Sequence, residues 1–198
     1  MAQVFTKTTD LPVSAKVAWQ WHANPGAFER LNPVFDPVVI EAREGGLEVG
    51  ASTRIRMKLG PVSQRWHAVH TACEPGVMFR DEQRGGPFSK WVHTHRFIDT
   101  GHGRSRLEDQ IEYELPVGPL GQWVGGSFTR ETIERAFIYR HAITLADLTR
   151  QSAFADRPRL TVAITGASGL VASALIPFLT TAGHRVVRVR RKGQEINV

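Results

Sequence analysis

Two histidines stand two residues apart in the segment 91–97, WVHTHRF, whose alternating pattern is typical of a β-strand. Because successive strand side chains point to opposite faces, His93 and His95 share one face. Asp81 and Asp109 fall on the equivalent faces of the alternating segments before and after it. Imidazoles and carboxylates gathered on one inner surface can orient the carbonyl or hydroxyl of a bound ligand, and both groups also ligate metal ions.

Three interpretations of this polar group stay open: a ligand anchor, a mutually satisfied hydrogen-bond network in the core, and a metal site. We take ligand anchoring as the working prediction and expect no metal ion. Cys73 lies beside a Glu-Pro-Gly turn with no motif around it, so no nucleophile arrangement is visible. The side chains predicted to contact the ligand are Asp81, Gln83, Trp91, His93, His95, Asp109, Tyr113 and Tyr139.

A second chemical motif follows a short linker at 153–159. The apolar run 160–165 predicts a buried parallel strand, and glycines follow it with the spacing of the turn that opens a dinucleotide-binding helix. Glycine lets the backbone approach a pyrophosphate at the helix N-terminus. Basic residues at the end of the next strand favour a 2′-phosphate, so we predict NADP, bound weakly. The residues predicted to contact it are Gly166, Ala167, Ser168, Gly169, Leu170, Arg190 and Arg191.

Composition restricts the class of protein. A single cysteine precludes an intramolecular disulfide and favours a reducing compartment, so we expect a soluble, cytoplasmic protein. No apolar run approaches the length of a membrane span, and no signal-peptide pattern opens the chain. The net charge is +6, but five of the 25 basic residues lie in 185–193 and no nucleic-acid motif accompanies them. We therefore predict no nucleic-acid partner.

The elements that must position the polar group can be read in order. Residues 4–9 predict a first strand, and two short helices follow, separated at Pro25-Gly26, with Ser14 as the first N-cap. From 38 to 115 the chain alternates with a period of two between glycine and proline turns, which predicts an antiparallel meander of about six strands. Its inner face starts apolar and becomes polar toward one end, as expected for a lined cavity.

The segment 121–151 predicts one helix of roughly 20–25 residues. Ser127 is a candidate N-cap, and His141 is assigned to the side that water solvates. The stripe expected to face the sheet is Phe128, Thr132, Ala136, Tyr139, Ile143 and Ala146. The predicted arrangement is an α+β fold in which a curved antiparallel sheet wraps around this long C-terminal helix.

This order of elements resembles the START-like, polyketide-cyclase-like (SRPBCC) helix-grip superfamily over residues 1–152. The segments FERLNPVF, FRDEQRGGPFSKWVHTHRF and FIYRHAITLADL are similar to one branch of it, which is usually fused ahead of an epimerase-like oxidoreductase domain. The resemblance implies a cavity for a hydrophobic small molecule. It does not identify that molecule, because the superfamily binds lipids, sterols, polyketides and plant metabolites.

Residues 160–198 resemble the start of the extended short-chain dehydrogenase/epimerase family, whose opening turn is matched by Thr165 to Gly169. The catalytic Tyr-x-x-x-Lys pair of that family is not in this sequence, since neither Tyr113 nor Tyr139 has a lysine four residues on. We therefore expect a partial Rossmann-like βαβ unit that is not competent as an oxidoreductase. A single such unit leaves sheet faces uncovered, and a homo-oligomer is one way to cover them.

Two classes of function follow from these patterns. The leading prediction is a binding module that holds a lipid, polyketide or isoprenoid-like molecule and is attached to the start of an NADP-type domain. The rival is an enzyme, either a fragment of a two-domain NAD(P)-dependent epimerase or oxidoreductase, or a cyclase- or hydratase-like catalyst that uses Asp81, His93 and His95.

Overall fold

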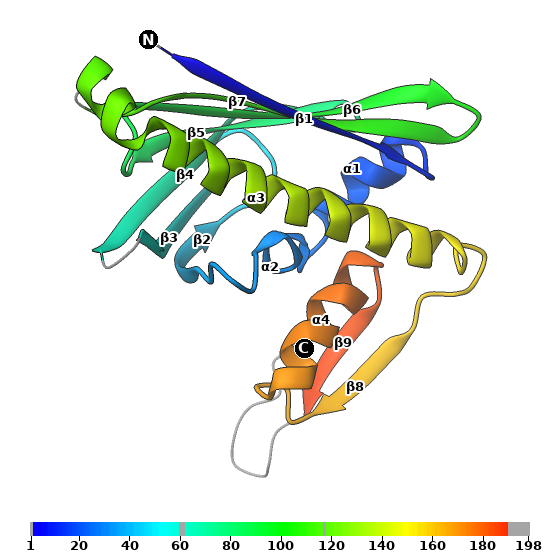
Figure 1. The fold of residues 1–198 in the computed structure, drawn as a ribbon. Helices are drawn as coiled ribbons and strands as arrows, with labels where there is room; N and C mark the ends of the chain where they lie inside the picture. Colours follow the sequence, from blue (N-terminus) through cyan, green and yellow to red (C-terminus); the bar gives the residue numbers. More distant parts are fainter. Residues whose placement is uncertain (1, 60–61, 117, 190–198) are drawn as a thin grey trace.

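The computed structural model describes residues 2–59, 62–116 and 118–189. A seven-stranded antiparallel sheet curves around one long helix (Figure 1). Its order is β1-β7-β6-β5-β4-β3-β2, so β2 to β7 form the predicted meander and β1 pairs with β7. The helix-grip fold is therefore confirmed. The strands are β1 (Gln3–Leu11), β2 (Val39–Glu44), β3 (Ser52–Leu59), β4 (Val62–Glu74), β5 (Met78–Gly85), β6 (Lys90–Gly101) and β7 (Arg104–Glu114).

The predicted alternation decides which side chains of the strands are buried. In β7 the burial alternates over the whole strand, and Leu107, Asp109, Ile111 and Tyr113 are buried while their neighbours are more exposed. In β3 the charged residues at 54, 56 and 58 are exposed on the outer face. One face of the sheet therefore meets water and the other packs against the helices.

Two short helices, α1 (Ala15–Ala23) and α2 (Ala27–Leu31), follow β1 as predicted. The chain turns between them at Gly26, whose φ of 92° lies in the left-handed region that glycine adopts without strain. Ser14 holds the N-cap position of α1, but its side chain makes no capping hydrogen bond. Ala18 and Trp21 of α1 are buried.

The long helix α3 (Gly118–Ser152) has 35 residues, so the predicted start at Ser127 and the predicted length are wrong. The predicted stripe is also wrong, because Phe128 is 62% exposed and Ala146 is exposed as well. The predicted stripe lies about one residue away from the face that is buried, because the prediction assigned polar side chains to the solvent. The side chains that α3 buries against the fold are Ile133, Phe137, His141, Thr144, Asp147 and Leu148.

Two apolar clusters fill the space between the sheet and the helices. The first includes Trp21, Phe79, Phe97 and Leu148, and the second is formed by the five side chains of Phe5, Ile111, Tyr113, Ile133 and Phe137. Along β7, the first cluster ends at residue 107 and the second begins at residue 111. The polar residue 109 therefore lies between two apolar groups.

The remaining elements form a separate two-stranded parallel sheet with one helix: β8 (Thr161–Thr165), α4 (Leu170–Thr181) and β9 (Arg185–Val189). The strand–turn–helix–strand order agrees with the prediction. The expectation of a buried strand is wrong, because β8 alternates between exposed and half-buried residues. Among the described residues only β9 pairs with it, so much of its surface still meets water.

Helix α4 packs against the helix-grip part of the chain (Figure 1). The Asn24 side-chain amide donates to the Thr181 carbonyl oxygen over 2.8 Å, and the Gln151 amide donates to the Thr181 hydroxyl over 3.2 Å. Arg30 lies over the Phe178 ring, 5.7 Å from its centroid. The βαβ unit is therefore docked on α2 and the end of α3, in addition to being joined by the linker.

Candidate functional site

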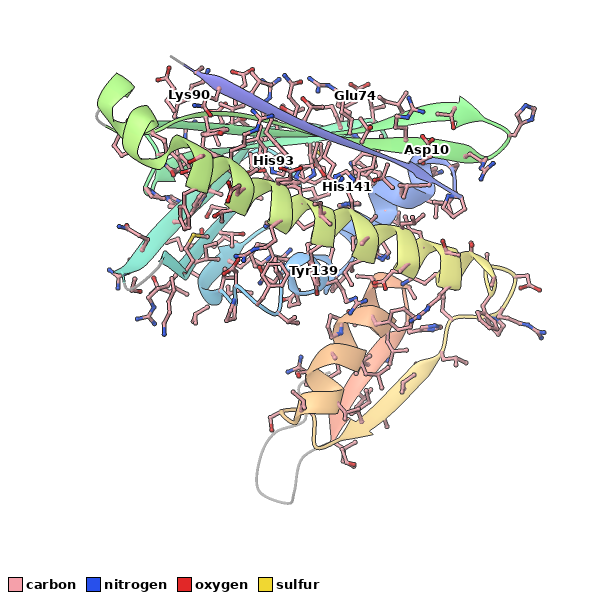
Figure 2. The ribbon with its side chains drawn as sticks, in the orientation of Figure 1. Asp10, Glu74, Lys90, His93, Tyr139 and His141 are labelled. Carbon is pink, nitrogen blue, oxygen red and sulfur yellow. The ribbon has the colours of Figure 1, made fainter. Side chains whose placement is uncertain are left out.

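The polar side chains of the inner face come from four neighbouring strands. His70 of β4 pairs with Asp81 of β5, and Asp81 pairs with His93 of β6. His95 of β6 pairs in turn with Asp109 of β7. Because directly opposed residues of antiparallel strands share a face, all five side chains point to the inner surface of the sheet. His93 and His141 lie between the sheet and α3 (Figure 2).

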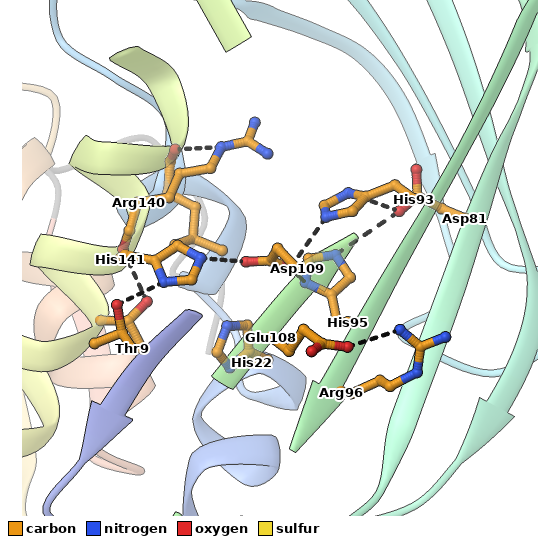
Figure 3. A network of polar contacts seen from close by, with 12 residues as sticks. Thr9, His22, Asp81, His93, His95, Arg96, Glu108, Asp109, Arg140 and His141 are labelled. Carbon is orange, nitrogen blue, oxygen red and sulfur yellow. Dashed lines mark hydrogen bonds and ion pairs between the residues drawn. The ribbon is translucent and has the colours of Figure 1, made fainter. Parts of the chain in front are cut away.

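Asp109 is the centre of a buried hydrogen-bond network (Figure 3). Its Oδ1 accepts from His93 Nε2 over 3.0 Å, and its Oδ2 accepts from His141 Nε2 over 2.7 Å. His95 Nδ1 lies 2.5 Å from Asp109 Oδ1, but outside the alignment of a hydrogen bond. Asp81 Oδ2 lies 3.4 Å from His93 Nδ1 and 3.8 Å from His95 Nε2. The two strand histidines are thus flanked by two carboxylates.

His141 is the member of this network that the sequence analysis did not predict, because it was assigned to the solvated face of α3. It is 2% exposed, and its Nδ1 lies 2.8 Å from the Thr9 hydroxyl of β1. The signal that could have found it is its spacing four residues after Phe137 on the buried side of the helix. Its place in α3 matches that of Asp109 in β7, since both lie between the two apolar clusters.

Burial and neighbouring charges shift the pKa values of the site residues in different directions. Burial alone would lower the pKa of His93, but hydrogen bonds from its ring to Asp109 and Asp81 raise it to about 9. Burial and the neighbouring His93 charge lower the pKa of His95 to about 4. Burial would raise the pKa of Asp109, yet His95, His141 and His93 hold it well below its usual range. His93 is therefore an imidazolium between two carboxylates at neutral pH, and His95 is neutral.

Half-buried aromatic rings adjoin the polar network on the same inner face. The Trp66 and Trp91 rings meet edge to face with centroids 4.8 Å apart, and Phe88 lies 4.9 Å from Trp91 and 5.5 Å from Trp66. Phe88 also contacts the buried Tyr113 ring, at 5.9 Å. We call Trp66, Phe88 and Trp91 the aromatic trio. Aromatic side chains that keep part of their surface accessible are the usual lining of a small-molecule site.

Not every predicted residue joins the site. The Gln83 amide donates to the Phe88 carbonyl oxygen over 2.7 Å, so it holds the β5–β6 turn. The Tyr113 hydroxyl donates to Gln3 over 2.6 Å. Tyr139 packs edge to face on Phe35, with centroids 5.7 Å apart, rather than against the polar network. The structure therefore brings together Asp81, Trp91, His93, His95 and Asp109 from the predicted set, with Tyr113 beside Trp91.

The predicted cofactor turn lies where the sequence placed it, between β8 and α4. Gly166 has a φ of 63°, and its carbonyl oxygen accepts from Gly169 N–H over 2.8 Å, which closes the turn at the helix N-terminus. Ala167 and Ser168 lie within this turn, and Leu170, the first residue of α4, is 90% exposed. Arg190 and Arg191 lie outside the described residues. The assignment of NADP therefore stays a prediction.

Two surface cavities lie away from the polar network. One of about 250 Å³ on the outer face of the sheet is lined by charged side chains that include Arg80, Lys90 and Glu112. The other, of about 410 Å³, lies between α1 and the β4–β5 turn and includes Trp19 and Val77. Neither is lined by the inner-face residues described above.

The family model described as polyketide cyclase/dehydrase and lipid transport matches residues 11–137, which is most of the helix-grip part. The chain belongs to this family. The match covers the strands that provide Asp81, His93, His95 and Asp109, and the part of α3 that ends at Phe137. No curated protein sequence matches the chain.

Solved structures agree with this fold. The nucleoside-diphosphate sugar epimerase from Corynebacterium glutamicum is 29% identical with a TM-score of 0.75; the alignment covers 96% of this chain, which spans 40% of that protein. The Zhui aromatase/cyclase from Streptomyces sp. R1128 is 13% identical, with a TM-score of 0.62 over 77% of this chain and 96% of that one. Norcoclaurine synthase from Thalictrum flavum is 14% identical, with a TM-score of 0.59, over 77% and 97%. The last two likenesses show the fold alone.

None of the described helices combines the length and the apolar content that crossing a bilayer requires.

Proposed function

We propose that the helix-grip part of this chain binds a hydrophobic small molecule that carries one polar end. The observation that supports this most is that an apolar surface and a polar one lie next to each other on the inner face of the sheet. The half-buried aromatic trio offers apolar contact, and the polar network beside it offers hydrogen-bond partners. The description of the family, polyketide cyclase/dehydrase and lipid transport, supports the same class of ligand.

The polar end of the ligand is assigned to Asp81 and His95. Asp81 keeps 16% of its side-chain surface exposed, while Asp109 keeps 4% and is engaged by the three histidines around it. His95 Nε2 lies 3.8 Å from Asp81 Oδ2, which is beyond hydrogen-bond distance. A ligand hydroxyl or carbonyl that reached these two groups would provide a hydrogen-bond partner for the His95 ring.

The aromatic trio gives a direct test of binding. We expect the tryptophan fluorescence of the full chain to change when an aromatic polyketide, fatty acid or isoprenoid from a panel is added. Trp66→Ala should weaken the binding of the best ligand about tenfold, because stacking and apolar contact are lost. Trp19→Ala is the matched control, since Trp19 is also partly buried but packs on the first apolar cluster. Equal affinities of the two variants would contradict this site.

The βαβ unit is the start of an NADP-type oxidoreductase or epimerase domain in this proposal. Its strand–glycine turn–helix–strand order and its parallel pairing support the assignment. The 29% identical nucleoside-diphosphate sugar epimerase from Corynebacterium glutamicum, of which this chain spans 40%, supports it as well. The whole-protein activity of such a domain needs residues that this sequence does not contain.

Dinucleotide binding by this chain should be weak and led by the phosphates. The turn at 166–169 can offer backbone N–H groups to a pyrophosphate, but no walls for the adenine or nicotinamide follow in the described residues. Calorimetric titration with NADPH should give millimolar affinity at best, on the order of −4 kcal/mol. Micromolar affinity would show that the site is complete, for example through a homo-oligomer, which sedimentation would detect.

One observation favours acid–base catalysis as the second candidate function. His93 is held as an imidazolium by Asp81 and Asp109, so it could donate a proton to a ligand oxygen in a cyclase- or hydratase-like step. A catalyst of this kind would lose turnover in His93→Gln while it still bound its substrate. Under the binding proposal, the bound ligand is recovered unchanged.

A further inference from the structure

We propose that Asp81, His93 and His95 form a binding site for a divalent first-row transition metal ion. The three candidate ligand atoms, one from each side chain, all lie within 4.8 Å of one another. Asp81 Oδ2 lies 3.4 Å from His93 Nδ1 and 3.8 Å from His95 Nε2. These distances place one carboxylate oxygen and two ring nitrogens around a common point.

The geometry is close to what such an ion requires. For metal–ligand bonds of about 2.0–2.1 Å in a tetrahedral site, neighbouring ligand atoms lie about 3.3 Å apart. The His93–Asp81 separation already matches this value, and the His95–Asp81 separation exceeds it by about half an ångström. The ligand atoms of the two rings lie within 4.8 Å of each other, so an ion would draw both rings and the Asp81 carboxylate together by side-chain rotation.

A second carboxylate orients both rings from behind, and this is the independent observation that favours a metal. The nitrogens that do not face Asp81 face Asp109 instead: His93 Nε2 at 3.0 Å and His95 Nδ1 at 2.5 Å. Metal-ligating histidines characteristically direct their other ring nitrogen at a carboxylate, which fixes the tautomer and the ring orientation. His141 of α3 hydrogen-bonds to Asp109, so the helix also helps to hold this carboxylate in place.

The ligand set and its surroundings select the class of ion. Two imidazoles and one carboxylate suit zinc and iron rather than magnesium or calcium, which prefer oxygen ligands. Three protein ligands leave at least one coordination position for water or a ligand oxygen, and 16% of the Asp81 side chain is exposed. The Arg140 guanidinium of α3 also lies close enough to Asp109 and Asp81 to interact with their charges. Binding of the ion displaces the proton from His93 Nδ1, and the two carboxylates then offset the charge of the ion. This inference does not depend on the small-molecule proposal.

The test uses the full chain without an affinity tag, with Zn²⁺ and spectroscopically visible Co²⁺ as probes. We expect one Co²⁺ per chain with a visible absorption band, displaced by Zn²⁺. Asp81→Asn should weaken the affinity for Co²⁺ by at least about tenfold. His102→Ala removes an exposed histidine from the β6–β7 turn and should leave the affinity unchanged. Equal binding by all three proteins would mean surface binding only and would overturn the proposal.

A measurement on the unmodified protein keeps the test valid even if Asp81→Asn fails to fold. In ¹⁵N-histidine spectra of the wild-type chain, Zn²⁺ should shift Nδ1 of His93 and Nε2 of His95. The ring nitrogens of His67, His102 and His184, on other parts of the chain, should stay in place. Absence of any shift on saturation with Zn²⁺, or shifts confined to those other rings, would also overturn the proposal.

Discussion

At the scale of single residues, the inner face of the sheet holds a charged network in a setting where charge is costly. His93 remains protonated because two carboxylates flank it, and His95 and His22 remain neutral because burial outweighs the carboxylates around them. The neutral His22 of α1 lies beside the network, and the centroid of its ring is 6.1 Å from that of His95. His93 therefore makes the stability of the fold depend on pH in one direction, and His22 and His95 in the opposite one.

The pH dependence that His22 contributes can be predicted with its sign. Burial lowers its pKa from 6.5 to about 4, so below pH 6.5 the unfolded chain takes up a proton that the folded chain refuses. The stabilisation is complete above pH 6.5 and falls by about 3 kcal/mol as the pH drops to 4. Between pH 7 and 4, the free energy of unfolding measured in urea should fall less for His22→Phe than for the wild type. Parallel curves for the two proteins would contradict a buried, neutral His22.

At the scale of elements, an ion pair between helices holds α2 against α3. Arg30 donates to both Asp147 oxygens, over 2.8 and 2.6 Å, and Asp147 is 1% exposed. Burial makes this pair costly to break. Without Asp147, the Arg30 guanidinium would lose both acceptors at a place where only 19% of its side chain is exposed to water. The pair also lies close to Phe178 of α4, over which the same guanidinium is placed.

Asp147→Ala should therefore lower the free energy of unfolding by about 3 kcal/mol, as expected when a buried pair loses one partner. Asp36→Ala provides the matched control, because Asp36 makes a 2.7 Å pair with Arg135 in which both side chains are largely exposed. That change should cost less than about 1 kcal/mol. Chemical denaturation of the two variants measures both values, and similar losses would show that burial does not separate the two pairs.

The strands were predictable from the sequence because each carries its own alternation between apolar and polar residues. Helix α3 was not, since its buried face mixes Phe137 and Leu148 with His141, Thr144 and Asp147. A prediction that assigns every polar residue to the solvent must therefore assign the wrong face of such a helix to the core. His141, which shares the Asp109 carboxylate with the two strand histidines, was missed for the same reason. Only the packing of α3 on β1 and β7 shows that His141 reaches Thr9 and Asp109.

At the scale of the whole molecule, the chain combines a helix-grip part with a βαβ unit that docks on it. The two parts meet closely at Gly26, where an added Cβ would collide with the Thr180 hydroxyl and lie 2.7 Å from the Pro177 Cα. Helix α4 can therefore pack here only because residue 26 has no side chain. The linker 153–159 is exposed throughout, and this docking limits how far its two ends can move apart.

Gly26→Ala should release α4 from its docking surface. Gly50→Ala is the matched control, since Gly50 has nearly the same φ, 93°, but nothing within 4 Å of an added Cβ. Both variants should lose about 1–2 kcal/mol through left-handed backbone strain. Only Gly26→Ala should accelerate limited proteolysis of the linker.

We expect the protease to cut the wild-type chain between Ala153 and Arg159 as well, more slowly, and to leave a stable core of residues 1–152. Resistance of the full chain, with a single unfolding transition shared by both parts, would contradict a separable βαβ unit.

The most direct test of the binding site is a paired measurement on His95→Ala, in which melting temperature and ligand affinity are both recorded. If the polar network anchors a ligand, the change removes a binding partner: affinity for the best member of the lipid, polyketide and isoprenoid panel should fall about tenfold, or 1.4 kcal/mol, with a modest loss of stability. If the network serves the core alone, partners left unpaired should cost about 1–3 kcal/mol each. A large drop in melting temperature, with no panel member bound by the wild type, would contradict the binding function.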